Sequence, residues 1–110
     1  MMVEPGDVVT VDFPGTLGTK RRPAVVVSTE TYHASRPDVI LALQTSQTTK
    51  AASPTDYILQ DWSIAGLRNA SALRSFLATV PASSVSVVGH LSSRDWQEVQ
   101  ARLRIALAVA

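Results

Sequence analysis

The residues best suited to chemistry in this sequence are three consecutive cations at positions 20–22, which Pro23 follows directly. Proline lacks a backbone N–H and biases the residue before it toward an extended conformation, so Arg22 is expected to project from the first residues of a strand. Its guanidinium is planar, permanently charged and forked, which fits the oxygens of a phosphate. We therefore predict that Arg22 can bind a phosphodiester, and a solvated basic turn is the alternative interpretation.

A cluster of hydroxyl side chains is the second feature that could take part in chemistry. Residues 45–49 have the sequence TSQTT and follow an apolar run at 39–43 that predicts a strand. Binding residues concentrate at strand ends and in the loops after them, so these hydroxyls could form a polar ledge. A turn rich in Ser and Thr that caps its own backbone is the alternative interpretation.

The two histidines, His33 and His90, are candidates for proton transfer near neutral pH. His33 lies in the polar stretch 28–37, for which we predict a loop with room for one helical turn, and there it is expected to be solvated. His90 lies near the end of a predicted strand, where it is expected to satisfy a buried hydrogen bond. Proton transfer is the less common role at both positions.

Length and composition exclude several classes of protein. The chain has 110 residues, of which 45% are hydrophobic and 17% charged, and this predicts a single globular domain over residues 1–110. The absence of Cys excludes disulfides, thiolate catalysis and a zinc finger, and no metal ion or cofactor is predicted. No apolar run is long enough to span a bilayer and no signal peptide is recognisable, so we expect a cytoplasmic protein. The net charge of +1 does not by itself indicate nucleic acid, although the cations at 20–22 allow a local positive field.

Apolar runs predict a small fold rich in β-strands. The run at 8–13 alternates with polar residues, as in a strand with one buried face, whereas 24–27 is continuously apolar, as in a strand buried on both faces. Gly15 and Gly18 predict a mobile or tightly bent loop between these strands, and that loop would also hold the three cations. Further strands are predicted at 39–43, 55–59, 71–80 and 85–91.

The clearest helix is at the C-terminal end of the sequence. Ser92 lies three residues before Asp95, which is typical of a helix that begins with a hydroxyl cap and a carboxylate in its first turn. Apolar residues then recur at helical spacing, so we expect this helix to cover the core as a lid. They are Trp96, Val99, Leu103, Leu107 and Ala110. Together the elements predict a strongly bent antiparallel sheet, or partly open barrel, with a C-terminal helix.

Three segments in order carry a resemblance that extends over nearly the whole chain. They are GDVVTVDF at 6–13, RPAVVVS at 22–28 and the strand that ends in TSQ at 45–47. Looser matches follow at Gly66-Leu67, Ser71, Thr79-Val80 and Gly89-His90-Leu91-Ser92. With this spacing the sequence resembles the MazF/PemK family of bacterial toxins. The resemblance implies an SH3-like barrel or bent sheet with an added helix, in agreement with the elements predicted above.

The resemblance also implies an activity. Members of this family are endoribonucleases of type II toxin–antitoxin systems, or mRNA interferases, and act without a metal ion or the ribosome. The 2′-hydroxyl of single-stranded RNA attacks the neighbouring phosphorus and leaves a 2′,3′-cyclic phosphate and a 5′-hydroxyl. By resemblance, Arg22 is the catalytic arginine that stabilises the developing charge, and Thr45 is the catalytic threonine that binds the scissile phosphate or positions the attacking hydroxyl. Substrate contacts are expected from Lys20, Arg21, Ser46, Gln47 and Arg74.

One expected group is missing from the sequence. In the PemK-like branch of the family, a carboxylate shortly after an arginine on a later strand is the general base, whereas here Ser75, Phe76 and Leu77 follow Arg74. Another group such as Asp12 or a histidine then serves as the base, or general-base assistance is modest, or the activity is low.

The resemblance further implies a homodimer and a cognate antitoxin, a small acidic protein whose disordered tail would compete with RNA for the cationic loop. Three alternatives stay open. The chain could be a binding module without catalysis, a family member that has lost catalysis but still binds its antitoxin, or a gyrase-directed toxin of the same fold. The last alternative depends on a Trp near the C-terminal end, whereas the last Trp here is Trp96, inside the predicted helix.

Overall fold

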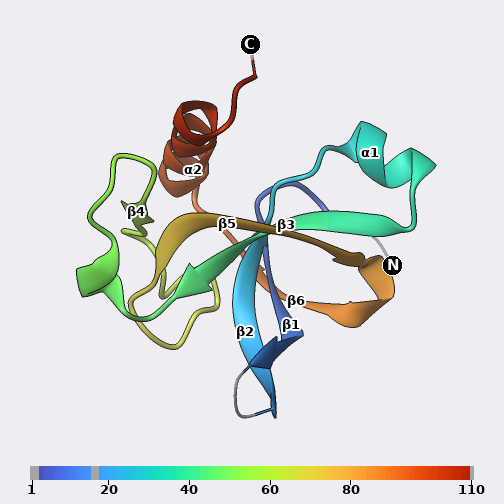
Figure 1. Ribbon diagram of the computed structural model, residues 1–110, viewed down its shortest axis with the longest axis horizontal. Coiled ribbons are helices and arrows are strands. Elements are labelled where there is room, and N and C mark those ends of the chain that lie inside the picture. Colours follow the sequence, from blue (N-terminus) through green and yellow to red (C-terminus); the bar gives the residue numbers. More distant parts are fainter. Residues whose placement is uncertain (1–2, 16–17, 110) are drawn as a thin grey trace.

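The computed structural model describes residues 3–15 and 18–109. Within them, six strands form one antiparallel sheet in the order β4-β5-β3-β2-β1-β6, with α2 packed against it (Figure 1). Along the chain the elements are β1 (Asp7–Gly15), β2 (Gly18–Val26), α1 (Glu30–Ser35), β3 (Asp38–Thr45), the 3-10 turn η1 (Thr48–Lys50), β4 (Tyr57–Ile58), β5 (Ala72–Pro81), the 3-10 turn η2 (Ala82–Ser84), β6 (Val85–His90) and α2 (Ser93–Ala106). The predicted fold class, a strongly bent antiparallel sheet with a C-terminal helix, is confirmed.

The β1–β2 hairpin is longer than predicted, and the three cations lie in a strand instead of a loop. They pair with β1 in the register Lys20–Phe13, Arg21–Asp12 and Arg22–Val11. The prediction was wrong because β1 continues its alternation past Phe13 and gives β2 a partner that includes an oppositely charged residue, Asp12. Residues 16 and 17, the middle of the predicted loop, lie outside the described residues.

Strand alternation divides the buried side chains into two core clusters, one on each face of the sheet. On the face beneath α2, Val8 and Val25 lie opposite each other, and on the other face Val9 lies opposite Ala24. The segment 24–26 is fully buried, which confirms the prediction of a strand buried on both faces. This double burial fixes the register of β2, because a shift of one residue would exchange the two faces.

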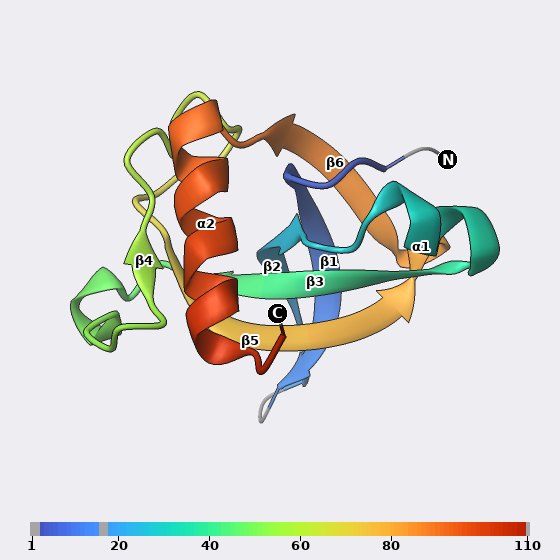
Figure 2. The ribbon, with the colours of Figure 1, turned by 90° about the horizontal axis from the view of Figure 1, so that it is seen from above.

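The C-terminal helix begins as predicted, because the Ser92 side chain caps it by accepting the backbone N–H of Asp95. Val99 is fully buried and Trp96 and Leu103 are partly buried against the same core, and Figure 2 shows α2 lying across β3 and β5. The helix ends at Ala106, so its predicted continuation through Leu107 was wrong, and Ala110 lies outside the described residues. None of the described helices is long and apolar enough to cross a membrane.

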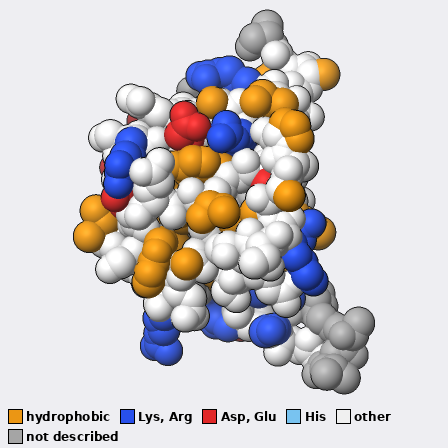
Figure 3. All heavy atoms as spheres, turned by 90° about the vertical axis from the view of Figure 1, so that its left-hand side faces the viewer, with side chains coloured by type: hydrophobic (Ala, Val, Ile, Leu, Met, Phe, Trp, Pro, Cys, Tyr) orange, Lys and Arg blue, Asp and Glu red, His pale blue; other side chains and the backbone are white. Residues whose placement is uncertain are grey.

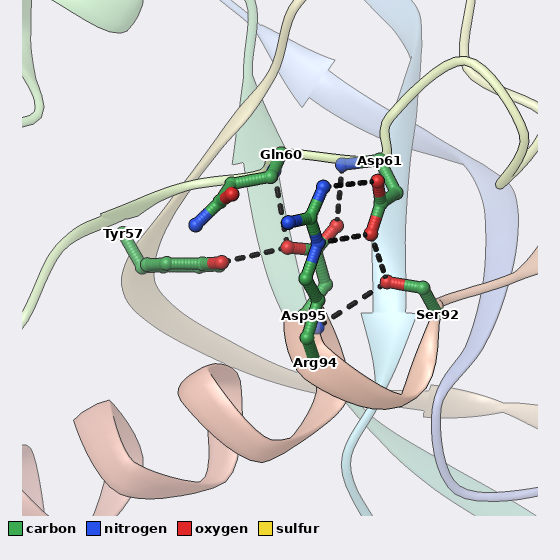
Figure 4. Close-up of polar contacts among 6 residues, drawn as sticks. All are labelled: Tyr57, Gln60, Asp61, Ser92, Arg94 and Asp95. Carbon is green, nitrogen blue, oxygen red and sulfur yellow. Dashed lines mark hydrogen bonds and ion pairs between the residues drawn. The ribbon is translucent and has the colours of Figure 1, made fainter.

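The first turn of α2 also contains a fully buried carboxylate, Asp95, which the sequence indicated only as a helix-start residue. Its Oδ1 accepts the Tyr57 hydroxyl at 2.6 Å and the backbone N–H of Gln60 at 3.0 Å, and its Oδ2 accepts the backbone N–H of Asp61 at 2.8 Å (Figure 4). Burial, together with this carboxylate, raises the pKa of the Tyr57 phenol, so that Tyr57 remains a donor. Asp95 thereby joins α2 to the segment 57–61.

A second carboxylate, Asp61, strengthens the same junction from the solvent side. Arg94 donates from Nε and Nη2 to its two oxygens, both at 2.7 Å, and the Ser92 hydroxyl donates at 2.6 Å (Figure 4). These hydrogen bonds, those of Arg94 foremost, lower the pKa of the Asp61 carboxyl from 3.8 to about 2.

We expect Asp95→Ala to destabilise the fold by about 3 to 5 kcal/mol, because it leaves one hydroxyl and two backbone N–H groups buried without their acceptor. The measurement is the free energy of unfolding from urea titration. Gln97→Ala, at an exposed position two residues further along α2, is the control and should change stability by less than about 0.5 kcal/mol. Equal stability of the two variants would contradict the role given to Asp95.

We expect Asp61→Asn to lower the free energy of unfolding near neutral pH and to matter progressively less in acid. The folded-state pKa of Asp61 is depressed, so its contribution is present above its unfolded value of 3.8 and is lost as the pH falls to about 2. Urea titrations of both proteins across this range give the measurement. A stability difference that stays constant down to the lowest pH would show that the Arg94 contact contributes nothing.

Candidate functional site

A groove of about 1130 Å³ opens where the outer half of the β1–β2 hairpin meets the end of β3 and the first half of β5. Five cations line it, and no Asp, Glu or His is among its described lining residues. The cations are Lys20, Arg21, Arg22, Arg68 and Arg74. Since the whole chain has a formal charge of +1, the rest of it carries −4. Figure 3 shows Lys and Arg side chains along the lower edge of the molecule, where the hairpin projects in Figure 1.

Arg22 and Thr45 lie at matching positions on two neighbouring strands. The pairing of β2 with β3 ends at Ala24–Leu43, and one further step of two residues along each strand leads to Arg22 and Thr45. Alternation places both side chains on the same face, and both line the groove. The ladder stops before this pair, so neither backbone is tied to the other at these two residues, and both side chains face the groove.

The two arginines of β2 differ in their partners. Arg21 forms an exposed ion pair with Asp12, with Nη1 3.1 Å from Oδ1, and donates to the Ser86 hydroxyl at 3.1 Å. Arg22 has no ion pair or side-chain hydrogen bond within the described part of the chain. Exposed ion pairs contribute little to stability, so Arg21 can exchange Asp12 for an anion, whereas Arg22 can accept one directly.

The hydroxyl end of β3 can donate hydrogen bonds into the groove. The Thr45 Oγ1 accepts the backbone N–H of Gln47 at 3.1 Å, which orients the hydroxyl and leaves its own proton free for another acceptor. Ser46 and Gln47 are exposed and line the groove as well. The ledge predicted from the TSQTT sequence and the turn that caps its own backbone are therefore both present, because the turn holds Thr45 in place.

A bulge in β5 brings Arg74 and Phe76 to the groove. Ala42 pairs with Leu77 and Gln44 with Leu73, so β5 has two more residues than β3 over this interval. The middle residue, Ser75, has φ +52°, the left-handed conformation that side chains other than Gly rarely adopt, and its hydroxyl donates to the Thr55 carbonyl at 2.8 Å. The sequence predicted the strand but contained no signal for the bulge.

The remaining wall is formed by residues 66–69, of which Arg68 and Asn69 were not identified from the sequence. Gly66 has φ +91°, and a Cβ on Gly89 would lie 2.0 Å from the Ala65 carbonyl oxygen. Two glycines therefore let this turn pack backbone to backbone against β6. The only sequence signal for Arg68 was its position shortly after a glycine turn, which is too common to single out a residue.

The candidates for a general base lie outside the groove lining. Asp12 is engaged with Arg21, and His90 Nδ1 lies 2.8 Å from the Asp7 carboxylate. The hydrogen bond expected of His90 is present, but the prediction that it is buried was wrong, because the His90 side chain is half exposed. His33 is not the solvated loop residue predicted, because its Nε2 lies 2.5 Å from the Ser28 hydroxyl and its Nδ1 is buried. It lies on α1, a short helix that the sequence allowed as one helical turn.

One group of potential metal ligands occurs among the described residues, with ligand atoms of Glu4, Asp7 and His90 within 4.8 Å of one another. The Asp7 oxygens already contact His90 and the backbone N–H of Glu4. None of the three lines the groove. The cluster is explained by the anchoring of the segment before β1 to the end of β6.

Comparison with known proteins identifies relatives of the chain. A family model described as "PemK-like, MazF-like toxin of type II toxin-antitoxin system" matches residues 4–107. No curated protein sequence matches. Similar solved structures are a MazE-MazF complex from Deinococcus radiodurans (TM-score 0.79, 19% identity, 100% of each chain covered) and an endoribonuclease in complex with its cognate antitoxin from a mycobacterial species (TM-score 0.81, 17% identity, 99% of this chain and 98% of that chain). A third is the Mycobacterium tuberculosis toxin MazF-mt6 (TM-score 0.74, 16% identity, 94% of this chain and 98% of that chain).

Proposed function

Because this chain belongs to the PemK-like, MazF-like toxins of type II toxin–antitoxin systems, which are endoribonucleases, we propose that it cleaves single-stranded RNA in the groove between Arg22 and Thr45. The observation that supports this proposal most directly is the matching register of these two residues across the open end of the β2–β3 pair. The five lining cations would hold the phosphates on either side of the cleaved bond.

Each residue has a role that its chemistry allows. The Arg22 guanidinium would donate to the nonbridging oxygens of the scissile phosphate, where negative charge grows as the phosphorus becomes five-coordinate. Thr45, which accepts one hydrogen bond from the Gln47 N–H, would donate its proton to the same phosphate or hold the attacking 2′-hydroxyl. Lys20, Arg21 and Arg74 would contact neighbouring phosphates.

The reaction would be an internal transfer. The 2′-oxygen forms a bond to the phosphorus, its proton leaves to an acceptor, and the bond to the 5′-oxygen breaks as that oxygen gains a proton. The products are a 2′,3′-cyclic phosphate and a 5′-hydroxyl, and DNA is inert because it lacks the nucleophile. The groove-lining residues include no carboxylate or imidazole among those described, so water would accept the first proton and the cationic field would promote ionisation of the 2′-hydroxyl.

The proposal also includes partners. One similar structure is an endoribonuclease in complex with its cognate antitoxin and another is a MazE-MazF complex, and a cationic groove of this kind would be closed by an acidic antitoxin segment that replaces the RNA. We also propose a homodimer and a cytoplasmic location, where cellular RNA is available. A catalytically inactive toxin that binds the same partners is the second candidate, favoured by the missing carboxylate after Arg74.

We expect Arg22→Ala to lower the cleavage rate of mixed-sequence single-stranded RNA in EDTA by at least about a hundredfold, because it removes the main donor to the transition-state oxygens. Thr45→Val, which keeps the shape but loses the hydroxyl, should also lower the rate. Mass spectrometry of the fragments should find cyclic phosphate and 5′-hydroxyl ends. The control is Arg104→Ala, an exposed arginine of α2 outside the groove, which should cleave like the parent. RNA binding without any cleavage by the parent protein would support the inactive alternative.

We expect the cleavage rate to rise with pH through the neutral range without a bell-shaped maximum. The described groove lining holds no carboxylate or imidazole that could accept the proton, so the rate should follow the hydroxide concentration. The measurement is the single-turnover rate between pH 5 and pH 9, again in EDTA. An inflection in this range that disappears in His33→Gln or His90→Gln would show instead that a histidine is the base.

A further inference from the structure

We propose that Phe76 is a stacking platform for one unpaired base of the bound RNA, presented to the groove by the bulge in β5. This inference rests on the proposed function and adds to it the part of the substrate that is bound and the residue that binds it. Phe76 stands shortly after Arg74, in the region of the strand where the resemblance leads us to expect a carboxylate.

The exposure of Phe76 is the first supporting observation. The chain contains two Phe residues, and both Phe13 and Phe76 line the groove. Phe13 is partly buried against the core, whereas Phe76 is 59% exposed. Unlike the other exposed apolar side chains of similar size, such as Ile105, this aromatic ring lies on the cationic groove, where it is free to contact a ligand.

The backbone of the bulge is the second observation. Ser75 adopts φ +52°, the one positive φ among the described residues other than Gly, and strain of this kind persists where the surroundings hold it in place. The Ser75 hydroxyl does so through its hydrogen bond to the Thr55 carbonyl. The bulge places a cation, Arg74, and an aromatic ring, Phe76, side by side on the groove.

The surrounding charge identifies the occupant as nucleic acid. A base has a flat face that stacks on a ring whatever its identity, and its phosphates require cations nearby, which is the usual composition of a groove for single strands. Here the ring lies on a groove with five cations and no described acidic residue. An acidic protein segment would also pair with the cations, but only a nucleic acid presents a flat base next to every phosphate, so the ring is the feature that favours RNA.

The test is the affinity of a mixed-sequence 2′-O-methyl RNA oligonucleotide, which has no 2′-hydroxyl to attack and is therefore not cleaved, measured by fluorescence anisotropy. We expect Phe76→Ala and Phe76→Leu to weaken binding about ten- to a hundredfold, and Phe76→Trp to keep the affinity and to show additional quenching of fluorescence on binding. Phe76→Leu separates stacking from simple apolar contact. Ile105→Ala, at an equally exposed position of α2 (58%), is the matched control and should bind like the parent.

Salt dependence gives a second readout for the two residues of the bulge. We expect Phe76→Ala to leave the slope of log affinity against log salt unchanged, because it removes no charge, and Arg74→Ala to reduce it by about 0.7. Circular dichroism of each variant establishes that it is folded.

Parent-like affinity of Phe76→Ala would overturn the proposal, as would a homodimer that this substitution dissociates while the affinity for RNA is unchanged, because the ring would then belong to a protein interface. Either result leaves the nuclease proposal intact as long as cleavage still requires Arg22. A parent protein that binds the oligonucleotide through Phe76 but does not cut unmodified RNA would overturn the nuclease activity and support the platform.

Discussion

The buried carboxylate of Asp95 is the constraint on which the arrangement of the groove depends. A buried carboxyl group is costly unless its oxygens are hydrogen-bonded, and here every donor to the Asp95 oxygens comes from residues 57–61. The place of α2 on the core therefore depends on the position of this segment. The turn that follows, 62–67, leads directly to the groove wall that contains Arg68, so the segment that Asp95 holds is also the one that leads into the groove.

Sheet geometry supplies the other half of the site. The ladder between β2 and β3 ends at Ala24–Leu43, whereas the β1–β2 hairpin continues to Gly15–Gly18. Arg22 and Thr45 lie two residues past the last pair of the β2–β3 ladder. The five cations gathered there repel one another while the rest of the chain carries −4, so charge self-repulsion lowers stability at the groove. A bound polyanion relieves that repulsion, and the same field attracts it from a distance.

Local patterns predicted the elements and the two central residues, because the features involved act over a few positions. Arg22 precedes a proline, Thr45 ends an apolar run, and the cap at Ser92 begins the helix, and each of these can be recognised within a short window. The role of Asp95 could not be predicted, because its partners are more than thirty residues away and a carboxylate in a first turn is usually exposed. The environment of His33 was predicted wrongly for the same reason, because nothing in a polar stretch indicates that the Ser28 hydroxyl will form a hydrogen bond with the imidazole ring.

The missing carboxylate and the exposed Phe76 ring are both features of the bulge in β5, and their effects on the groove are linked. A carboxylate beside Arg74 would pair with the cations of the groove, as Asp12 pairs with Arg21, and would weaken the field that stabilises the transition-state phosphate. It would, however, supply a proton acceptor. With Ser75 and Phe76 in this segment, the groove keeps its full positive potential and gains a surface for a nucleobase, but it lacks a side chain that could accept the proton.

Binding energy gained from a stacked nucleobase accelerates the reaction only where it positions the scissile phosphate against Arg22, because contacts that are equal in the ground and transition states leave the chemical step unchanged. Under the proposed mechanism, the bulge, held by the hydrogen bond of Ser75 to Thr55, would therefore position the substrate against Arg22, whose charge would stabilise the reacting phosphate.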